Sequence, residues 1–231
     1  EDVPPIAYEL ARRFWPGPLT MILRRKPIVP DVTTAGLDTV GMRCPDHPVA
    51  LALIREAGVP VAAPSANRSG RPSCTRAQDV REDMDGRIDG IVDGGPCAVG
   101  VESTILDLTC EPPRLLRPGG LPLEELEAVL GHVEIDRAVT SPLKPGEQPK
   151  APGMKYRHYA PKAPVTVVTG GPEASAAEIA RRLQPGDGVI CFDEFASRFP
   201  GHSVETLGPK GDKSAQAQRL FDALRAFDSV E

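Results

Sequence analysis

The 231-residue sequence has few aromatic side chains: one Trp, three Tyr and six Phe. Proteins that bind single-stranded nucleic acid without sequence preference stack the bases on a series of aromatic rings, and so few rings argue against such a platform. The sequence also lacks an excess of positive charge, because 27 basic and 32 acidic residues give a formal net charge of −5. This balance argues against a dedicated duplex-binding protein, although it leaves room for a local basic groove around a small anion.

Long hydrophobic runs and paired cysteines are also missing. No apolar run approaches the roughly 20 residues that span a membrane, and no signal-like apolar segment opens the chain. The five cysteines, Cys44, Cys74, Cys97, Cys110 and Cys191, contain no C-x-x-C pair. This pattern predicts reduced thiols and argues against a disulfide framework or a zinc site. We therefore expect a cytoplasmic protein that does not contact membranes.

Helical and strand patterns alternate along the chain, with frequent turns because Gly (22) and Pro (26) are abundant. The patterns predict helices at 4–14, 48–57, 123–130, 174–183 and 214–227. They predict strands at 19–23, 40–43, 59–63, 91–92, 103–108, 114–116, 165–168 and 188–192. A further helix is expected after Thr75, with Thr75 and Gln78 forming a capping box. The alternation predicts an α/β or mixed α+β sheet.

Composition divides the chain into three predicted parts. Residues 1–135 form the first domain, and residues 136–163 form a linker that is rich in proline and charge. In residues 164–231 a strand, a helix, a strand and a helix follow one another. This order predicts a small, parallel, doubly wound domain of Rossmann-like type.

The segment 61–73 is the richest in functional groups. A predicted strand runs into a loop that offers hydroxyls, the Asn67 amide, the guanidinium groups of Arg68 and Arg71, and backbone that Gly70 leaves accessible. Such a loop suits an anion such as a phosphate. The alternative is a polar turn capped by its Ser and Asn side chains. An ordinary P-loop is excluded because the G-x-x-x-x-G-K-[ST] pattern is absent.

Two arginines and a serine lie at predicted strand ends. Arg43 and Arg117 can each hold a carboxylate or phosphate through two parallel hydrogen bonds, although Arg43 can equally form a surface ion pair with Asp46. Ser103 opens a strand, where strand alternation puts it on the same side as Ile105. Its hydroxyl can bind a substrate or have a structural role only.

The linker contains an unusual aromatic stretch at 151–161, with two Tyr, one His and two basic residues between prolines. Interdomain linkers are normally solvated and poor in aromatic residues. This stretch therefore either packs on the second domain or closes over a site as a lid.

Six segments, taken together and in order, resemble the YrdC-like threonylcarbamoyl-adenylate synthases in their long, two-domain form. The segments are F-W-P-G-P-L-T, G-M-R-C-P-D-H-P, A-A-P-S-A-N-x-S-G-x-P-S, E-S-T-I-L-D, L-L-R-P-G-G and P-G-M-K-Y-R-H-Y-A-P. The resemblance covers nearly all of residues 1–165 and more loosely the rest. It implies a twisted open sheet with helices, followed by a linker and a small Rossmann-like domain.

The resemblance also implies a reaction. L-Threonine and bicarbonate give an N-carboxy-threonine, whose carboxylate attacks the α-phosphorus of ATP and expels pyrophosphate. The product then passes to a threonylcarbamoyl-transferring partner enzyme that modifies an adenosine of tRNA. The protein's task in such a phosphoryl transfer is to position the reactants and to neutralise charge.

Site residues follow from the same resemblance. The implied nucleotide contacts are Thr39, Ser65, Ser73, Arg117 and, from the linker, Tyr156. The implied threonine contacts are Arg43, the backbone at Ala63, and Ser103, and Asn67 is implied to orient a phosphate or a metal ion. Mg²⁺ is expected to enter with ATP and to be held largely by phosphates.

The sequence departs from the family at both ends. The family's N-terminal segment, with a threonine-contacting Thr and a basic K-x-R element, would lie before Glu1, and the last part of the second domain would lie after Phe227. We therefore expect a partial sequence whose 231 residues alone bind nucleotide poorly and turn over little.

Three other functions remain open. A carbamoyl-transferring maturation factor would carry Cys-rich zinc fingers, which are missing here. A non-catalytic RNA- or nucleotide-binding YrdC-like module would bind in a salt-sensitive manner without needing ATP. A structural remnant would keep the motifs without activity.

Overall fold

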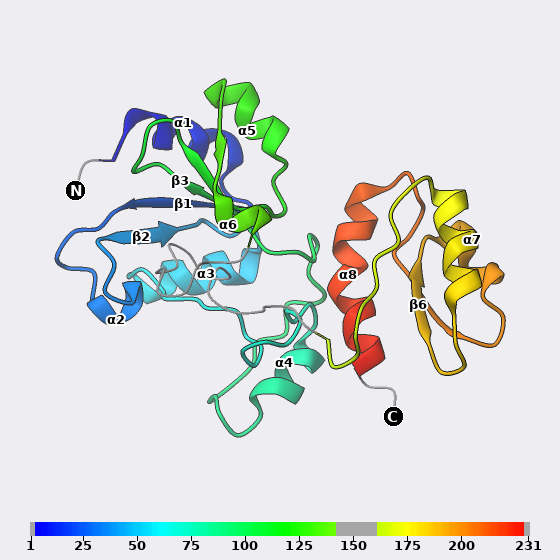
Figure 1. Cartoon of the computed structure of the whole chain (residues 1–231). Coiled ribbons are helices and arrows are strands. Elements are labelled where there is room, and N and C mark those ends of the chain that lie inside the picture. Colours follow the sequence, from blue (N-terminus) through cyan, green and yellow to red (C-terminus); the bar gives the residue numbers. More distant parts are fainter. Residues whose placement is uncertain (1–2, 142–160, 229–231) are drawn as a thin grey trace. The chain divides into compact units, whose positions relative to one another are not determined.

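The computed structural model describes residues 3–141 and 161–228 (Figure 1). The chain divides into two compact units, each of which joins two stretches that are distant in sequence. The first unit is Glu1–Pro64 with Glu102–Tyr156, and the second unit is Ser65–Val101 with Arg157–Glu231. This grouping differs from the expected division at 135 and 164, because residues 65–101 group with the C-terminal stretch rather than with the first sheet.

A five-stranded mixed sheet forms the centre of the first unit, with strand order β2-β1-β3-β4-β5. The strands are β1 (Leu19–Arg24), β2 (Thr39–Met42), β3 (Thr104–Asp107), β4 (Arg114–Arg117) and β5 (Glu134–Ile135). The β1/β3 and β4/β5 pairs are parallel, whereas the β1/β2 and β3/β4 pairs are antiparallel. The predicted mixed α+β class is confirmed.

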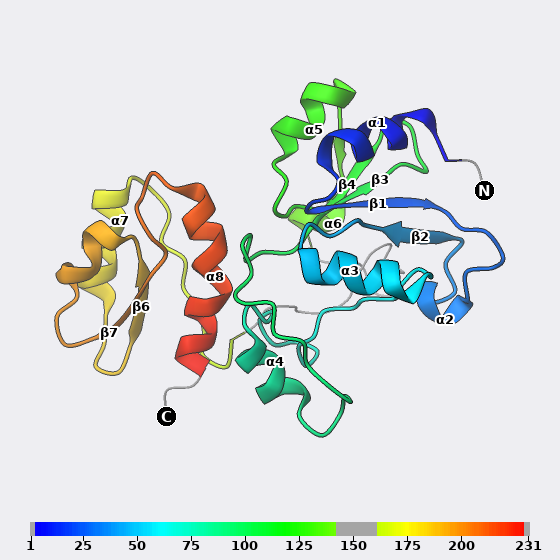
Figure 2. The same cartoon turned by 180° about the vertical axis from the view of Figure 1, so that it is seen from behind.

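Helices α1 and α5 cover one face of this sheet (Figures 1 and 2). The helices of the unit are α1 (Pro5–Phe14), α2 (Asp31–Thr34), α3 (Pro48–Ala57), α5 (Leu123–Leu130) and α6 (Arg137–Thr140). Glycines end two of them: Gly58 follows α3 with φ 64°, and Gly131 follows α5 with φ 77°. Glycine adopts this backbone conformation without the steric cost of a Cβ atom.

Strand alternation gives the sheet two different faces. The face under α1 and α5 carries the main hydrophobic core, formed by Ala7, Leu10, Leu19, Met21, Leu23, Leu106, Leu115, Leu121, Leu126 and Val133. The opposite face carries only a small apolar cluster of Ile22, Ile105 and Leu116. The second face therefore has room for polar side chains next to the strands.

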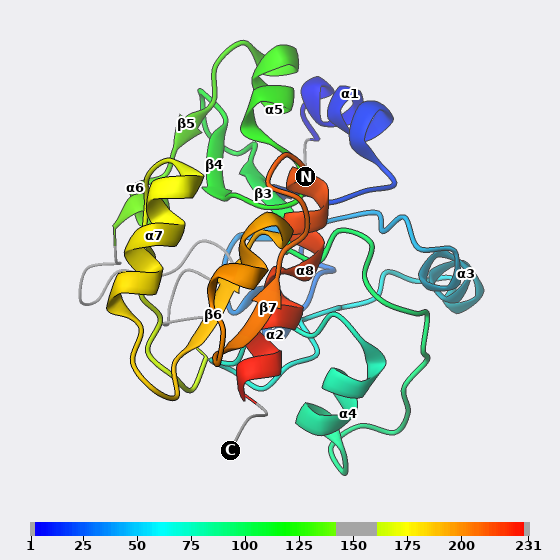
Figure 3. The same ribbon diagram turned by 90° about the vertical axis from the view of Figure 1, so that its right-hand side faces the viewer.

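The second unit contains a two-stranded parallel sheet, which lies between two helices (Figure 3). Its elements are α4 (Ala77–Met84), α7 (Pro172–Arg182), β6 (Gly188–Cys191), the 3-10 helix η1 (Asp193–Arg198), β7 (Ser203–Thr206) and α8 (Lys213–Asp228). Ala176, Val189, Phe195 and Phe199 form its core. Within the two described ranges, no helix combines the length and apolar character that a membrane span requires.

Three predicted strands are wrong. Residues 59–63, 91–92 and 165–168 belong to no strand of the described structure, and Val59, Val92 and Val167 are more than half exposed. A run of β-branched residues favours extended backbone, but a strand also needs a neighbour with which to exchange hydrogen bonds. Several short elements escaped prediction: α2, β5, α6, η1 and β7.

The predicted cap of α4 is also wrong. The carboxylate of Asp79, not the Thr75 and Gln78 side chains, makes the capping bonds, and it binds the two residues that precede the helix. Asp79 Oδ2 accepts hydrogen bonds from the amides of Thr75 and Arg76, at 3.0 and 3.1 Å. A carboxylate in the first helical turn also suits the positive end of the helix dipole.

We predict that Gly100→Ala destabilises the second unit. Gly100 is buried with φ 78°, and an added Cβ atom would lie 2.3 Å from Cα of Gln218 in α8. A left-handed alanine and an overpacked contact together cost about 2–4 kcal/mol. Urea unfolding followed by far-UV circular dichroism measures the change. Gly90→Ala is the matched control, because a Cβ atom there meets nothing within 4 Å; equal losses in both variants would contradict the tight contact.

Candidate functional site

A polar cluster occupies the second face of the first unit's sheet. Ser103 immediately precedes β3, and its hydroxyl lies 2.7 Å from that of Thr20 on β1. The Arg117 guanidinium, at the end of β4, donates to the Ser103 carbonyl at 2.9 and 3.2 Å and to the Ser103 hydroxyl at 3.2 Å. The cluster therefore joins two of the predicted site residues, Ser103 and Arg117, and adds Thr20.

Small residues allow the chain to approach this cluster closely. Gly119 lies against the strand start, because an added Cβ atom would come within 2.3 Å of the Glu102 carbonyl oxygen. A side chain at Gly41 on β2 would also be tightly placed, because an added Cβ atom would lie 3.3 Å from the side chains of Thr20 and Ile22. These contacts give a physical reason for glycine in the L-L-R-P-G-G and G-M-R segments of the sequence.

The register of the sheet decides which other predicted residues share this face. Thr39 pairs with Arg24 and Gly41 with Ile22, so Thr39 lies on the same face as Ile22 and Thr20. Arg43 follows β2 directly and is exposed. Ala63 is exposed and belongs to no strand, and no described hydrogen bond links it to the cluster.

The loop with the remaining predicted residues belongs to the second unit. Asp83 of α4 supports this loop from beneath: its carboxylate accepts from the Arg68 amide at 3.0 Å and pairs with the Arg71 guanidinium. The Asn67 side chain holds the loop from inside by donating to the carbonyls of Arg68 and Arg71, at 2.9 and 3.2 Å. These hydrogen bonds hold the loop as a compact polar turn, which is the alternative that the sequence predicted for this segment.

Asn67 Oδ1 is a polar atom of this loop that is left unsatisfied. It is a buried oxygen without a hydrogen-bond partner among the described residues. Such an acceptor fits a cation, a ligand N–H group or a water molecule. No group of three His, Cys, Asp or Glu side chains within the described ranges could hold a metal ion. A single amide oxygen, without a cluster of carboxylates, fits an Mg²⁺ ion that takes most of its ligands from a bound phosphate and water.

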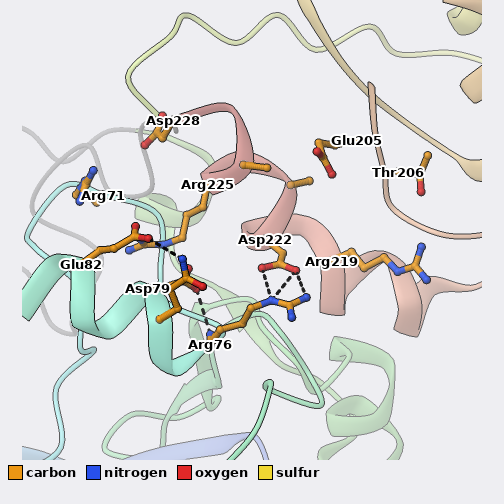
Figure 4. A pocket seen from close by; sticks show the side chains of 13 residues that line it. Arg71, Arg76, Asp79, Glu82, Glu205, Thr206, Arg219, Asp222, Arg225 and Asp228 are labelled. Atoms are coloured by element: carbon orange, nitrogen blue, oxygen red, sulfur yellow. Dashed lines mark hydrogen bonds and ion pairs between the residues drawn. The ribbon is translucent and has the colours of Figure 1, made fainter. Parts of the chain in front are cut away.

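A cavity of about 540 Å³ lies in the second unit, between α4 and α8 (Figure 4). Its walls carry arginines and carboxylates together: Arg71, Arg76, Arg219, Arg225, Asp79, Glu82, Glu205, Asp222 and Asp228. Arg76 Nε donates to both carboxylate oxygens of Asp222, at 2.9 and 3.0 Å. The positive and negative charges of the walls neutralise one another. The cavity therefore lacks the excess of positive charge that an anion site needs, and its ion pairs link α4 to α8.

Electrostatics keep the supporting groups in fixed charge states. Burial raises the pKa of Asp83, but hydrogen bonds from Arg225, the Arg68 amide and Arg71 outweigh it and hold the pKa below its ordinary value. Burial raises the pKa of the Cys74 thiol to about 11, so this thiol is neutral at pH 7. At pH 7 the loop is therefore supported by an ionised carboxylate beside an unreactive thiol.

The predicted residues thus fall into three groups. Thr39, Arg43, Ala63, Ser103 and Arg117 belong to the first unit, whereas Ser65, Asn67 and Ser73 belong to the second. Tyr156 lies outside the described residues, and its role as a nucleotide contact stays a prediction.

Sequence reasoning missed Thr20 and Asp83. Thr20 is the last residue of the F-W-P-G-P-L-T segment, which offered a signal for it. Asp83 offered none, because a carboxylate in the acidic helix of 77–84 resembles an ordinary solvated charge.

Comparison with known proteins finds two family models in succession along the chain. The model described as "Telomere recombination", for Sua5, YciO and YrdC proteins, matches residues 1–119. The model described as "Threonylcarbamoyl-AMP synthase, C-terminal domain" matches residues 121–231.

Curated relatives named threonylcarbamoyl-AMP synthase match nearly the whole chain. The Bacillus subtilis protein is 49% identical over 97% of this chain and 65% of its own length. The Pyrococcus abyssi and Schizosaccharomyces pombe proteins are 48% and 43% identical over 99% of this chain, and over 66% and 60% of their own lengths. The crystal structure of P. abyssi Sua5 complexed with L-threonine matches with a TM-score of 0.93 at 45% identity, covering 100% of this chain and 67% of that one. The chain therefore spans slightly less than two thirds of the curated relatives.

We predict that Asp83→Asn removes an acid-sensitive part of the second unit's stability. The folded pKa of Asp83 is depressed, so its contribution is complete above the unfolded carboxyl pKa and is lost as the pH falls through the folded value. At pH 7 the variant should lose about 3–5 kcal/mol, because Arg225 is left buried without its counter-charge. As the pH falls, the free energy of unfolding should decrease less in the variant than in the unmutated chain. Urea unfolding at pH 7, 5 and 3 measures this difference. Asp85→Asn, at an exposed position after the same helix, should follow the parent at every pH; parallel pH profiles for the parent and Asp83→Asn would contradict the assignment.

Proposed function

Because the chain belongs to the Sua5, YciO and YrdC family, we propose that the protein is an L-threonylcarbamoyladenylate synthase. The observation that carries the proposal is similarity to synthases along nearly the whole chain, through both family regions. The synthase converts L-threonine, bicarbonate and ATP into threonylcarbamoyl-AMP and pyrophosphate.

The proposed reaction has two steps that balance in atoms and charge. The threonine amine attacks bicarbonate, and loss of water leaves an N-carboxylate on threonine. One oxygen of this carboxylate then forms a bond to the α-phosphorus of ATP, and the bond from that phosphorus to the bridging oxygen breaks as pyrophosphate leaves. No side chain needs to act as a covalent nucleophile, so positioning and charge neutralisation account for the catalysis.

The first unit supplies groups suited to the amino acid and to the phosphate. Arg43 is exposed at the end of β2, where its guanidinium can hold the threonine carboxylate in a bidentate manner. Ser103 is only 7% exposed, and its hydroxyl is oriented by Thr20 and Arg117. We assign Arg43, Ser103 and the backbone at Ala63 to threonine, and Thr39 and Arg117 to the nucleotide.

The second unit supplies the loop that we assign to the ATP phosphates. Ser65 offers an exposed hydroxyl, and Ser73 lies at the other end of the turn. Asn67 Oδ1 would face the Mg²⁺–phosphate group, because no described side chain satisfies it. When bound, Mg²⁺ would neutralise charge on the phosphates.

The product would be a mixed anhydride of a carbamate and a phosphate, which hydrolyses readily. We therefore propose that it passes to a threonylcarbamoyl-transferring enzyme that acts on an adenosine of tRNA, in the cytoplasm where both are present. This chain would contact tRNA only indirectly.

Pyrophosphate release tests the proposed function. The assay contains ATP, L-threonine, bicarbonate and Mg²⁺, and is run on this chain and on one extended to the length of the curated relatives. We expect release from the extended chain that stops when threonine or bicarbonate is omitted, and little release from the 231 residues alone. Salt-sensitive RNA binding without any release would favour the non-catalytic module instead.

Arg43→Ala should raise the KM for threonine without changing the KM for ATP. Loss of a hydrogen bond to a charged group costs about 1.5–3 kcal/mol, or roughly 10- to 100-fold in affinity. Initial rates at varied threonine and at varied ATP separate the two constants in the extended chain. Arg55→Ala removes an exposed arginine from α3 in the same unit and should leave both unchanged. An equal rise in both constants for Arg43→Ala would argue against a specific threonine contact.

A further inference from the structure

Arg225 of α8 is a buried arginine that the proposed reaction does not use. Its side chain is 8% exposed, and it reaches back to the loop of the other stretch of the second unit. Nε and Nη2 donate to the Pro72 carbonyl at 3.1 and 2.8 Å, and Nε also donates to the Ser73 carbonyl at 3.3 Å. Nη2 further contacts Cys74 Sγ at 3.2 Å. One guanidinium thus holds three successive residues of the loop.

The counter-charge of Arg225 is Asp83, which binds the other part of the same loop. Arg225 Nη2 lies 2.7 Å from Asp83 Oδ2, and the Asp83 side chain is fully buried. The same carboxylate accepts from the Arg68 amide and pairs with Arg71. Consequently, the Arg225 guanidinium and the Asp83 carboxylate, which are buried together, hold residues 68–74 in place.

Four further contacts, made by two residues of α8, hold this helix in place against residues 65–101. Gln218 donates to the Cys97 carbonyl at 3.3 Å, and Gly100 packs against the backbone of Gln218. Asp222 accepts from Arg76 and from the Thr75 hydroxyl at 3.3 Å (Figure 4). Arg225 therefore acts from a helix that is fixed independently, so its guanidinium is preorganised towards the loop.

We propose that Arg225 is a positioning residue for the nucleotide loop, so that the C-terminal family region supports ATP binding through the backbone of this loop. The proposal rests on the proposed function, which assigns Ser65, Asn67 and Ser73 to the nucleotide. Arg225 touches neither ATP nor threonine; it sets the loop backbone that carries those side chains. A misplacement of about 1 Å in such a loop can cost as much as 100-fold in rate.

The chemistry of the pair explains why arginine is needed at this position. The planar guanidinium offers five N–H donors in a fixed fork, and four acceptors surround Arg225: two carbonyls, a thiol sulfur and a carboxylate. A lysine would keep the charge opposite Asp83, but its single ammonium group cannot reach all of these acceptors. Arg225→Lys therefore separates the charge from the hydrogen-bond geometry.

The test compares Arg225→Met and Arg225→Lys with the parent in the chain extended to the length of its relatives. Arg181→Met is the matched control, since Arg181 forms an exposed ion pair with Glu178 on α7 of the same unit. We expect Arg225→Met to raise the KM for ATP about 10- to 100-fold, by the rule that 1.4 kcal/mol is tenfold, while the KM for threonine stays within about twofold. Arg225→Lys should fold and give an intermediate KM for ATP.

Hydrogen exchange of residues 66–74 without nucleotide provides a readout that is independent of activity. Faster exchange in Arg225→Met and Arg225→Lys, with no change in Arg181→Met, would support the positioning role. An unchanged KM for ATP together with unchanged exchange of the loop in Arg225→Lys would overturn it. If the unmutated extended chain releases no pyrophosphate, the proposed function fails. Hydrogen exchange of residues 66–74 then decides the loop contact alone, and unchanged exchange in the Arg225 variants would overturn it.

Discussion

The second unit depends on a carboxylate and a guanidinium that are buried together. Asp83 and Arg225 are 142 residues apart in sequence, and each compensates a charge that would otherwise be costly away from water. Both also bind the backbone of residues 68–74. The conformation of that loop therefore depends on both partners, and a change to either one removes a support of the loop backbone.

The first unit carries its main hydrophobic core and its polar cluster on opposite faces of its sheet. Leu19, Met21 and Leu23 face α1 and α5 in the main core, whereas Thr20 and Ile22 face the opposite side. Strand alternation alone produces this separation. The polar cluster of Thr20, Ser103 and Arg117 can thus vary with little effect on the core, while the core holds the strand ends that carry the cluster.

Local patterns predicted most of the longer elements because their causes are local. Glycine at 58 and 131 ends α3 and α5, and short apolar runs at 105–106 and 115–116 mark β3 and β4. The predicted side of Ser103 is also confirmed, since Ser103 contacts Thr20 while its neighbour Thr104 bonds to the Leu121 backbone of the main core. Residues 59–63 and 165–168 failed because strand formation depends on a pairing partner, which a local pattern does not contain.

The sequence by itself determined the family, the order of its motifs, the mixed α+β class and the residue types available for binding. Only the tertiary structure decided which other side chains hold the candidate binding residues in place. Asp83 looks like a solvated charge in an acidic helix, and Arg225 looks like a polar residue of an amphipathic one. Their roles follow from exclusion of water, and exclusion of water depends on which distant segments pack together rather than on any neighbouring residue.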